Sequence, residues 1–139
     1  MAYSATPATQ PFATQVPRQR IAGQVVFTGE VIFEKGFTLK PATVGALGTV
    51  YTDATAIPAG TQLATVTGGD TAKGVILPTS RPGTQIVVYN SAAATLKVYP
   101  QVGGSINAAG TNVAMVVTAN RSVTFVCLDG VAWSGQLSA

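Results

Sequence analysis

The second half of the chain is a succession of short apolar stretches separated by tight turns. Residues 84–89, 94–99, 113–117 and 123–127 each have the composition of a strand, because β-branched and aromatic residues are concentrated in them. Asp129 and Gly130 stand between two apolar runs, which is a strong hairpin signal. No segment has a helical pattern of useful length. This pattern predicts an all-β unit.

The first half gives weaker signals of the same kind. Residues 24–28, 31–33, 37–39, 49–52, 62–66 and 74–77 are the strand candidates, and glycine and proline punctuate them. Short strands with such turns are typical of a two-sheet sandwich, and a jelly roll is the connectivity that we expect for residues 23–139. No repeat of fixed period is found, so we do not expect an elongated solenoid.

The composition indicates a surface that is covered by other subunits. Of the 139 residues, 47% are hydrophobic and only 9% are charged, whereas ordinary soluble domains have roughly 25% charged residues. Strands 113–117 and 123–127 are apolar on both faces, since Val116 and Val126 lie opposite the residues expected in the core. Both observations predict a protein that assembles.

Membranes and nucleic acid are not expected partners. The longest apolar run is residues 113–117, far shorter than the ~20 residues that a membrane-spanning helix needs. The N-terminus has neither the basic nor the apolar part of a secretory signal. The net charge is +3, and the eight basic residues are scattered rather than gathered into a stripe.

Residues 1–22 are predicted to form an extended N-terminal arm. The segment is rich in Thr, Gln and Ala, and its three prolines, Pro7, Pro11 and Pro17, block both a helix and a central strand. Such a segment is disordered alone or becomes ordered against a partner.

Four residues of this arm are the candidate partner-binding residues. Tyr3 and Phe12 could anchor the arm in pockets of a neighbouring subunit, although free tails are equally common. Arg18 and Arg20 precede every acidic residue of the chain, so this stretch is locally basic and suited to an acidic protein surface. Two solvated arginines at the edge of a tail are the alternative interpretation.

Catalytic, metal and cofactor sites are not expected. The chain has no histidine and one cysteine, which excludes an internal disulfide and the clusters that bind zinc. Cys127 lies in a predicted strand on the same face as Val123 and Phe125, where a small buried thiol is routine. Two of the five acids, Asp70 and Asp129, have the sequence context of turn residues. We therefore predict that the chain is not an enzyme.

The aromatic residues leave one other function open. Trp133, with Tyr51, Tyr89 and Tyr99, could form a platform that stacks on sugar rings. Such a site also needs converging polar groups, which a sequence cannot reveal. The alternative is that Trp133 packs in the core and closes the end of the sandwich, which is the more common role of such a residue.

One segment resembles a module of tailed-bacteriophage virion proteins. The stretch Val87-Val-Tyr-Asn-Ser-Ala-Ala-Ala-Thr-Leu-Lys-Val-Tyr-Pro100 is similar to a hairpin of small virion proteins, followed here by a Gly-Gly turn and an Ile-Asn pair at residues 103–104 and 106–107. The closing strands and Trp133 extend the resemblance over residues 82–135, whereas residues 1–80 match nothing comparable.

This resemblance implies a structural virion protein without catalytic residues or cofactors. A capsid decoration (cement) protein is the main expectation: a homotrimer on the outer capsid surface that bridges neighbouring capsomers by binding the major capsid protein. A head-fibre base is the other common form, and the same module occurs in tail components. The alternative function is a tail or head-fibre module that binds host surface carbohydrate.

Overall fold

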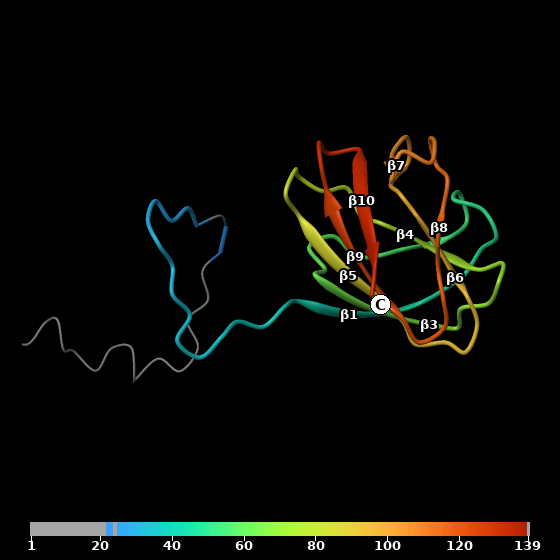
Figure 1. Ribbon diagram of the computed structural model, residues 1–139, viewed down its shortest axis with the longest axis horizontal. Helices are drawn as coiled ribbons and strands as arrows, with labels where there is room; N and C mark the ends of the chain where they lie inside the picture. The colour runs from blue at the N-terminus through green and yellow to red at the C-terminus, as the bar shows by residue number, and fades with distance from the viewer. Residues whose placement is uncertain (1–21, 24, 139) are drawn as a thin grey trace, which may run out of the picture. The chain divides into compact units, whose positions relative to one another are not determined.

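A computed structural model describes residues 22–23 and 25–138. A boundary between Gly36 and Phe37 divides the chain into two units. All ten strands lie in the second unit, which is called the β domain here (Figure 1). No helix among the described residues is long and apolar enough to cross a membrane.

The β domain contains two sheets. The larger sheet has the order β1-β3-β5-β9-β10-β7 and the smaller sheet has the order β2-β4-β6-β8. In Figure 1, β5, β9 and β10 lie on one side of the domain and β4, β6 and β8 on the other. The strands are β1 (Pro41–Gly45), β2 (Thr55–Ala56), β3 (Leu63–Thr67), β4 (Gly74–Ile76), β5 (Gln85–Asn90), β6 (Leu96–Tyr99), β7 (Ser105–Ile106), β8 (Met115–Val117), β9 (Ser122–Cys127) and β10 (Ala132–Leu137).

The chain changes sheet after every strand from β1 to β8, so the strands stack as successive coils. Along the larger sheet, Pro41 pairs with Leu63, 22 residues later, and Leu63 pairs with Val87, 24 residues later. Both pairings are parallel, and β2, β4 and β6 are parallel in the same way. The antiparallel strands β8, β9 and β10 follow these coils. This arrangement is a short solenoid-like stack that is completed by antiparallel strands.

The sequence prediction of an all-β chain with two sheets is confirmed for the β domain, but its connectivity differs from the expected jelly roll. A jelly roll is built from antiparallel Greek keys, whereas β1, β3 and β5 are parallel neighbours here. An elongated solenoid was not expected, and the short solenoid-like stack of these coils was not predicted either. The coils differ in length, so a search for a fixed period does not detect them.

Side chains from both sheets form one hydrophobic core. The largest fully buried side chains include Trp133 and Phe125 from the larger sheet and Val98 and Val117 from the smaller one. Leu96 and Val98 face inward from β6, and Val123, Phe125 and Cys127 are buried on one face of β9, as predicted.

Asn90 connects the two sheets inside this core. It ends β5, and its side-chain amide donates hydrogen bonds to the C=O groups of Ala94 at 2.8 Å, Val117 at 3.1 Å and Thr118 at 3.2 Å. Its side-chain oxygen accepts a bond from the N–H of Ala92 at 3.1 Å. A buried amide must satisfy its polar atoms, and the cross-sheet position of Val117 means that Asn90 fixes the distance between the sheets.

Several predicted strands are not formed. The described residues of 24–28, and residues 31–33 and 37–39, belong to no strand, and residues 49–52 lie in bends and turns. Strands β1, β2 and β7 were not predicted. The candidates at 62–66, 74–77, 84–89, 94–99 and 123–127 match β3, β4, β5, β6 and β9, and the hairpin at Asp129 and Gly130 joins β9 to β10.

Candidate interaction surface

The four arm residues that the sequence assigns to partner binding lie outside the described residues. These are Tyr3, Phe12, Arg18 and Arg20. Their contact with a capsid protein stays a prediction.

Exposed large apolar side chains are concentrated in residues 25–33. Val25, Val26, Phe27, Val31 and Ile32 are between 39% and 73% exposed. They belong to two similar triplets, Val-Val-Phe and Val-Ile-Phe, that start six residues apart. We call residues 25–33 the apolar segment. Monomeric proteins rarely expose large side chains in such density, and this clustering is typical of a surface that binds another protein.

A tight turn follows the apolar segment. The N–H of Gly36 donates a hydrogen bond to the C=O of Phe33 at 3.1 Å, and Gly36 has a φ of +77°. A turn that ends in a left-handed glycine is the loop of a common type of β-hairpin. Residues on both sides of this turn nevertheless lie outside every strand, so the turn is formed without the hairpin.

The outer face of the larger sheet has no charge. None of the residues in β1, β3, β5, β7, β9 and β10 is Asp, Glu, Lys or Arg. Thr65, Val87, Tyr89 and Val126 are half-buried, although they point away from the core. Across all ten strands, Lys97 of β6 is the single charged residue. Charged residues are depleted at the centres of protein interfaces, so this face fits the same kind of partner as the apolar segment.

An uncharged groove of about 420 Å³ lies at one end of this sheet. Leu39 and Val87 line it with apolar side chains, and Gln62, Thr84 and Gln85 supply polar groups. The groove is open, and no carboxylate or amine lines it. It can accept an uncharged chain segment, but it contains no group suited to acid–base chemistry.

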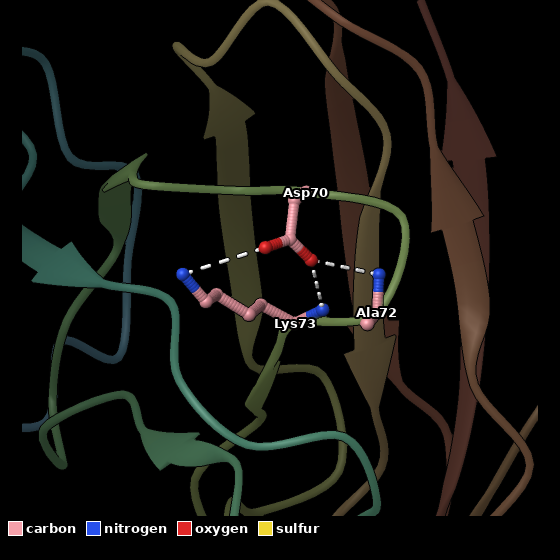
Figure 2. A network of polar contacts seen from close by, with 3 residues as sticks. All are labelled: Asp70, Ala72 and Lys73. Carbon is pink, nitrogen blue, oxygen red and sulfur yellow. Dashed lines mark hydrogen bonds and ion pairs between the residues drawn. The ribbon is translucent and has the colours of Figure 1, made fainter.

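The acids of the β domain stabilise loops. Asp70 accepts hydrogen bonds from the backbone N–H groups of Ala72 at 2.8 Å and Lys73 at 2.9 Å, and an ion pair with Lys73 Nζ at 3.4 Å completes the loop (Figure 2). The backbone N–H of Lys73, followed by that of Ala72, lowers the pKa of Asp70. The loop from Gly68 to Gly74 is therefore closed by its own carboxylate, and no helix follows it that could bind a phosphate.

Asp129 and Asp53 do the same in other loops. Asp129 accepts bonds from the N–H groups of Val131 at 2.9 Å and Ala132 at 2.7 Å. The bond from Ala132, followed by that from Val131, lowers the pKa of Asp129. Asp53 accepts bonds from the N–H groups of Thr49 and Val50, both at 2.9 Å. The prediction that Asp70 and Asp129 are turn residues is confirmed.

The residues proposed for other chemistry are buried. Cys127 is buried, and its thiol lies 3.7 Å from the C=O of Ser80. Trp133 is in the core, where its indole N–H donates to the side chain of Gln101. Tyr99 is buried as well, and its hydroxyl donates to the C=O of Thr49 at 3.0 Å. Burial, followed by the nearby carboxylate of Asp53, raises the pKa of Tyr99. Neither Trp133 nor Tyr99 is available as a platform for sugar rings.

Within the residues that the structure describes, no group of three or more Cys, Asp or Glu lies close enough to hold a metal ion. The arrangement can therefore bind through apolar contact and through backbone hydrogen bonds. The sequence analysis predicted strands at residues 24–28 and 31–33 and missed the exposure of the apolar segment. The signal was present, because three consecutive apolar residues occur twice, without the polar alternation of a half-buried strand.

The sequence matches no known family model and no curated protein sequence, so these comparisons assign the chain to no family.

Proposed function

We propose that this chain is a non-enzymatic structural protein that stabilises a protein shell, as a capsid decoration (cement) protein of a tailed bacteriophage. The observation that carries the proposal is the exposure of the apolar segment ahead of a complete β domain. In this proposal the β domain is the support, the apolar segment provides contact with other subunits, and the arm of residues 1–22 provides the contact with the shell.

The energetics favour docking of the apolar segment on another protein. Full burial of a Val, Ile or Phe side chain stabilises a complex by about 1.5–3 kcal/mol. Five such side chains, Val25, Val26, Phe27, Val31 and Ile32, are exposed in the single chain. Several modest contacts on one rigid oligomer add up through multivalency, so a decoration protein needs no single deep pocket.

The composition of the β domain supports the same function. Its larger sheet exposes an uncharged face, and Asp53, Asp70 and Asp129 are engaged in loops. A surface with few charges is suited to being covered by neighbouring subunits. Self-association, as a homotrimer, is therefore part of the proposal.

The capsid as the partner rests on the resemblance of residues 82–135 to virion proteins. The proposed partners are the major capsid protein and further copies of this chain, on the outer capsid surface of the virion. The arm residues Tyr3, Phe12, Arg18 and Arg20 remain the proposed contacts with the capsid. The carbohydrate-binding alternative has less support, because Trp133 and Tyr99 are buried.

The experiment measures the copy number of the chain in purified virions, by quantitative mass spectrometry against the major capsid protein. A decoration protein should be present in hundreds of copies, in a simple ratio to the shell subunit. A few dozen copies or fewer would instead indicate a tail or fibre component, and absence from the particle would refute the virion proposal.

A further inference from the structure

Strand β1 is the longest open edge of the two sheets. It is the first strand of the larger sheet and pairs with β3 alone. It has five residues, whereas the other three terminal strands, β2, β7 and β8, have two or three. Short edge strands are one way in which proteins prevent unwanted pairing, so β1 is the edge at which another strand can best be added.

The backbone groups at this edge can be assigned from the pairing with β3. The C=O of Lys40 accepts a bond from Leu63 at 3.1 Å, and the N–H of Ala46 donates to Thr67 at 2.8 Å. Because alternate residues of a strand direct their N–H and C=O groups to opposite sides, Thr43 and Gly45 direct theirs away from β3. Pro41 lies on the same side, where its missing N–H breaks no bond to β3. The open edge therefore offers two donors and three acceptors.

The apolar segment has the pattern of a strand that fits this edge. In an extended conformation its odd-numbered residues share one face, which is apolar from Val25 to Phe33 with Gly29 in the middle. The other face combines Val26 and Ile32 with the polar residues Thr28 and Glu30. Ala42 and Val44 of β1 face the core, so an added strand would extend this core by placing its odd-numbered residues next to them.

Through the turn between Phe33 and Gly36, the apolar segment cannot pair with β1 of its own chain and place its odd-numbered residues toward the core. A hairpin with this turn would pair Phe33 with Phe37, and, without a bulge, Thr28 with Ala42 and Val26 with Val44. Directly opposite residues share a face, so Thr28 and Glu30 would then point to the core and Phe27 would point away from it. A strand from a second copy is not restricted to this register.

Each copy has one apolar segment and one long open edge, at β1. Exchange between copies in a closed ring therefore pairs the segment and the edge of every subunit. Charge favours the exchange as well. Residues 25–36 contain two acids and one lysine, whereas residues 37–138 contain five basic and three acidic residues. We propose that residues 25–33 of one copy add as a strand to the open edge of β1 of a second copy. This deepens the self-association in the proposed function and needs no capsid.

The test is cross-linking between two single-cysteine variants of the full chain. In the proposed exchange, Thr28 and Thr43 lie on the same outer face, so Thr28→Cys and Thr43→Cys chains, when mixed and treated with a short bis-maleimide, should give a covalent dimer. Cys127 is buried and does not compete. The matched control mixes Thr28→Cys with Thr124→Cys, because Thr124 is exposed on β9, away from the edge. This pair should remain uncross-linked.

A second variant tests the edge itself. Thr43→Pro removes an N–H that points away from β3, so the domain should fold and unfold as the unmodified chain does, yet sediment as a monomer. The inference is overturned if Thr43→Pro associates like the unmodified chain, or if a cross-link forms only within a single Thr28→Cys/Thr43→Cys chain. A negative result would not refute the proposed binding to the capsid, because the experiment uses the purified chain alone and measures only self-association.

Discussion

Strand β9 and the apolar segment contain the same residue types but differ in burial. Phe125 of β9 is 0% exposed, whereas Phe27 of the apolar segment is 65% exposed. In β9 every second residue is buried, and the strand pairs with β5 on one side and β10 on the other. The apolar segment has neither the strict alternation nor a neighbouring strand.

This difference separates two roles of apolar residues. In β9 they stabilise the fold, because neighbouring strands position them against the opposite sheet. In the apolar segment they contribute little to the single chain, and their free energy of burial becomes available on association. Substitutions in the two regions should therefore affect different measurements.

The largest effect on folding is expected for Trp133→Ala. Trp133 is among the largest fully buried side chains, and its truncation should lower the free energy of unfolding by about 3–5 kcal/mol. Chemical denaturation measures the change, and Trp133→Phe, which keeps most of the buried area, should lose much less. A folded Trp133→Ala protein of unchanged stability would contradict the assignment of Trp133 to the core.

Asn90→Ala should have the next largest effect. It leaves the C=O groups of Val117 and Thr118 without the side-chain amide that now donates to them, which should destabilise the domain by about 1–3 kcal/mol. Asn90→Asp tests the cause, because a carboxylate would face these oxygens and should destabilise at least as much. An Asn90→Asp protein as stable as the unmodified chain would show that donation by the amide is not what matters.

The loop carboxylates predict a smaller, pH-dependent effect. The pKa values of Asp70 and Asp129 are lowered in the folded chain, so their contribution is complete above the unfolded pKa of about 3.9 and is lost as the pH falls through the folded values. The raised pKa of Tyr99 has the opposite consequence, a loss of stability as the pH rises above about 10.

Between the acidic and the alkaline decrease, denaturation midpoints should be nearly independent of pH, since the chain has no histidine. In an Asp70→Asn/Asp129→Asn protein, stability should fall much less at acidic pH than in the unmodified chain. An acid decrease that is the same in this variant would place its origin in other groups.

The smallest effect on folding is expected in the apolar segment. Phe27 and Val102 are similarly exposed, at 65% and 71%, so Phe27→Asp and Val102→Asp should both change the free energy of unfolding by less than about 0.5 kcal/mol. Sedimentation should separate them, because only Phe27→Asp places a charge on the odd-numbered face that the proposed strand exchange turns toward the core. Equal association of the two variants would contradict the role of the apolar segment.

The sequence predicts those strands that have both alternation and clear turn signals, such as β9 and the hairpin that follows it. Strand β1 was not predicted, because Pro41 disfavours a strand at this position. Pro41 is tolerated because its missing N–H faces the open edge rather than β3.

The parallel stacking was not predictable from periodicity, because successive coils differ in length. Residues 24–28 and 31–33 were predicted as strands because β propensity is local, whereas strand formation depends on partner strands that the local sequence does not reveal. The burial of Trp133 and Cys127 was predicted correctly, since both lie in apolar runs beside a recognisable hairpin.

Hydrogen exchange of the full chain, dilute and concentrated, tests the central claim that the β domain is stable alone while the apolar segment becomes ordered only on association. The account predicts that amides of β5 and β9 exchange slowly at both concentrations. Amides of residues 25–33, with those of Thr43 and Gly45, should exchange fast in the dilute chain and slowly in the concentrated one. Equal protection of residues 25–33 at both concentrations, whether high or low, would contradict it.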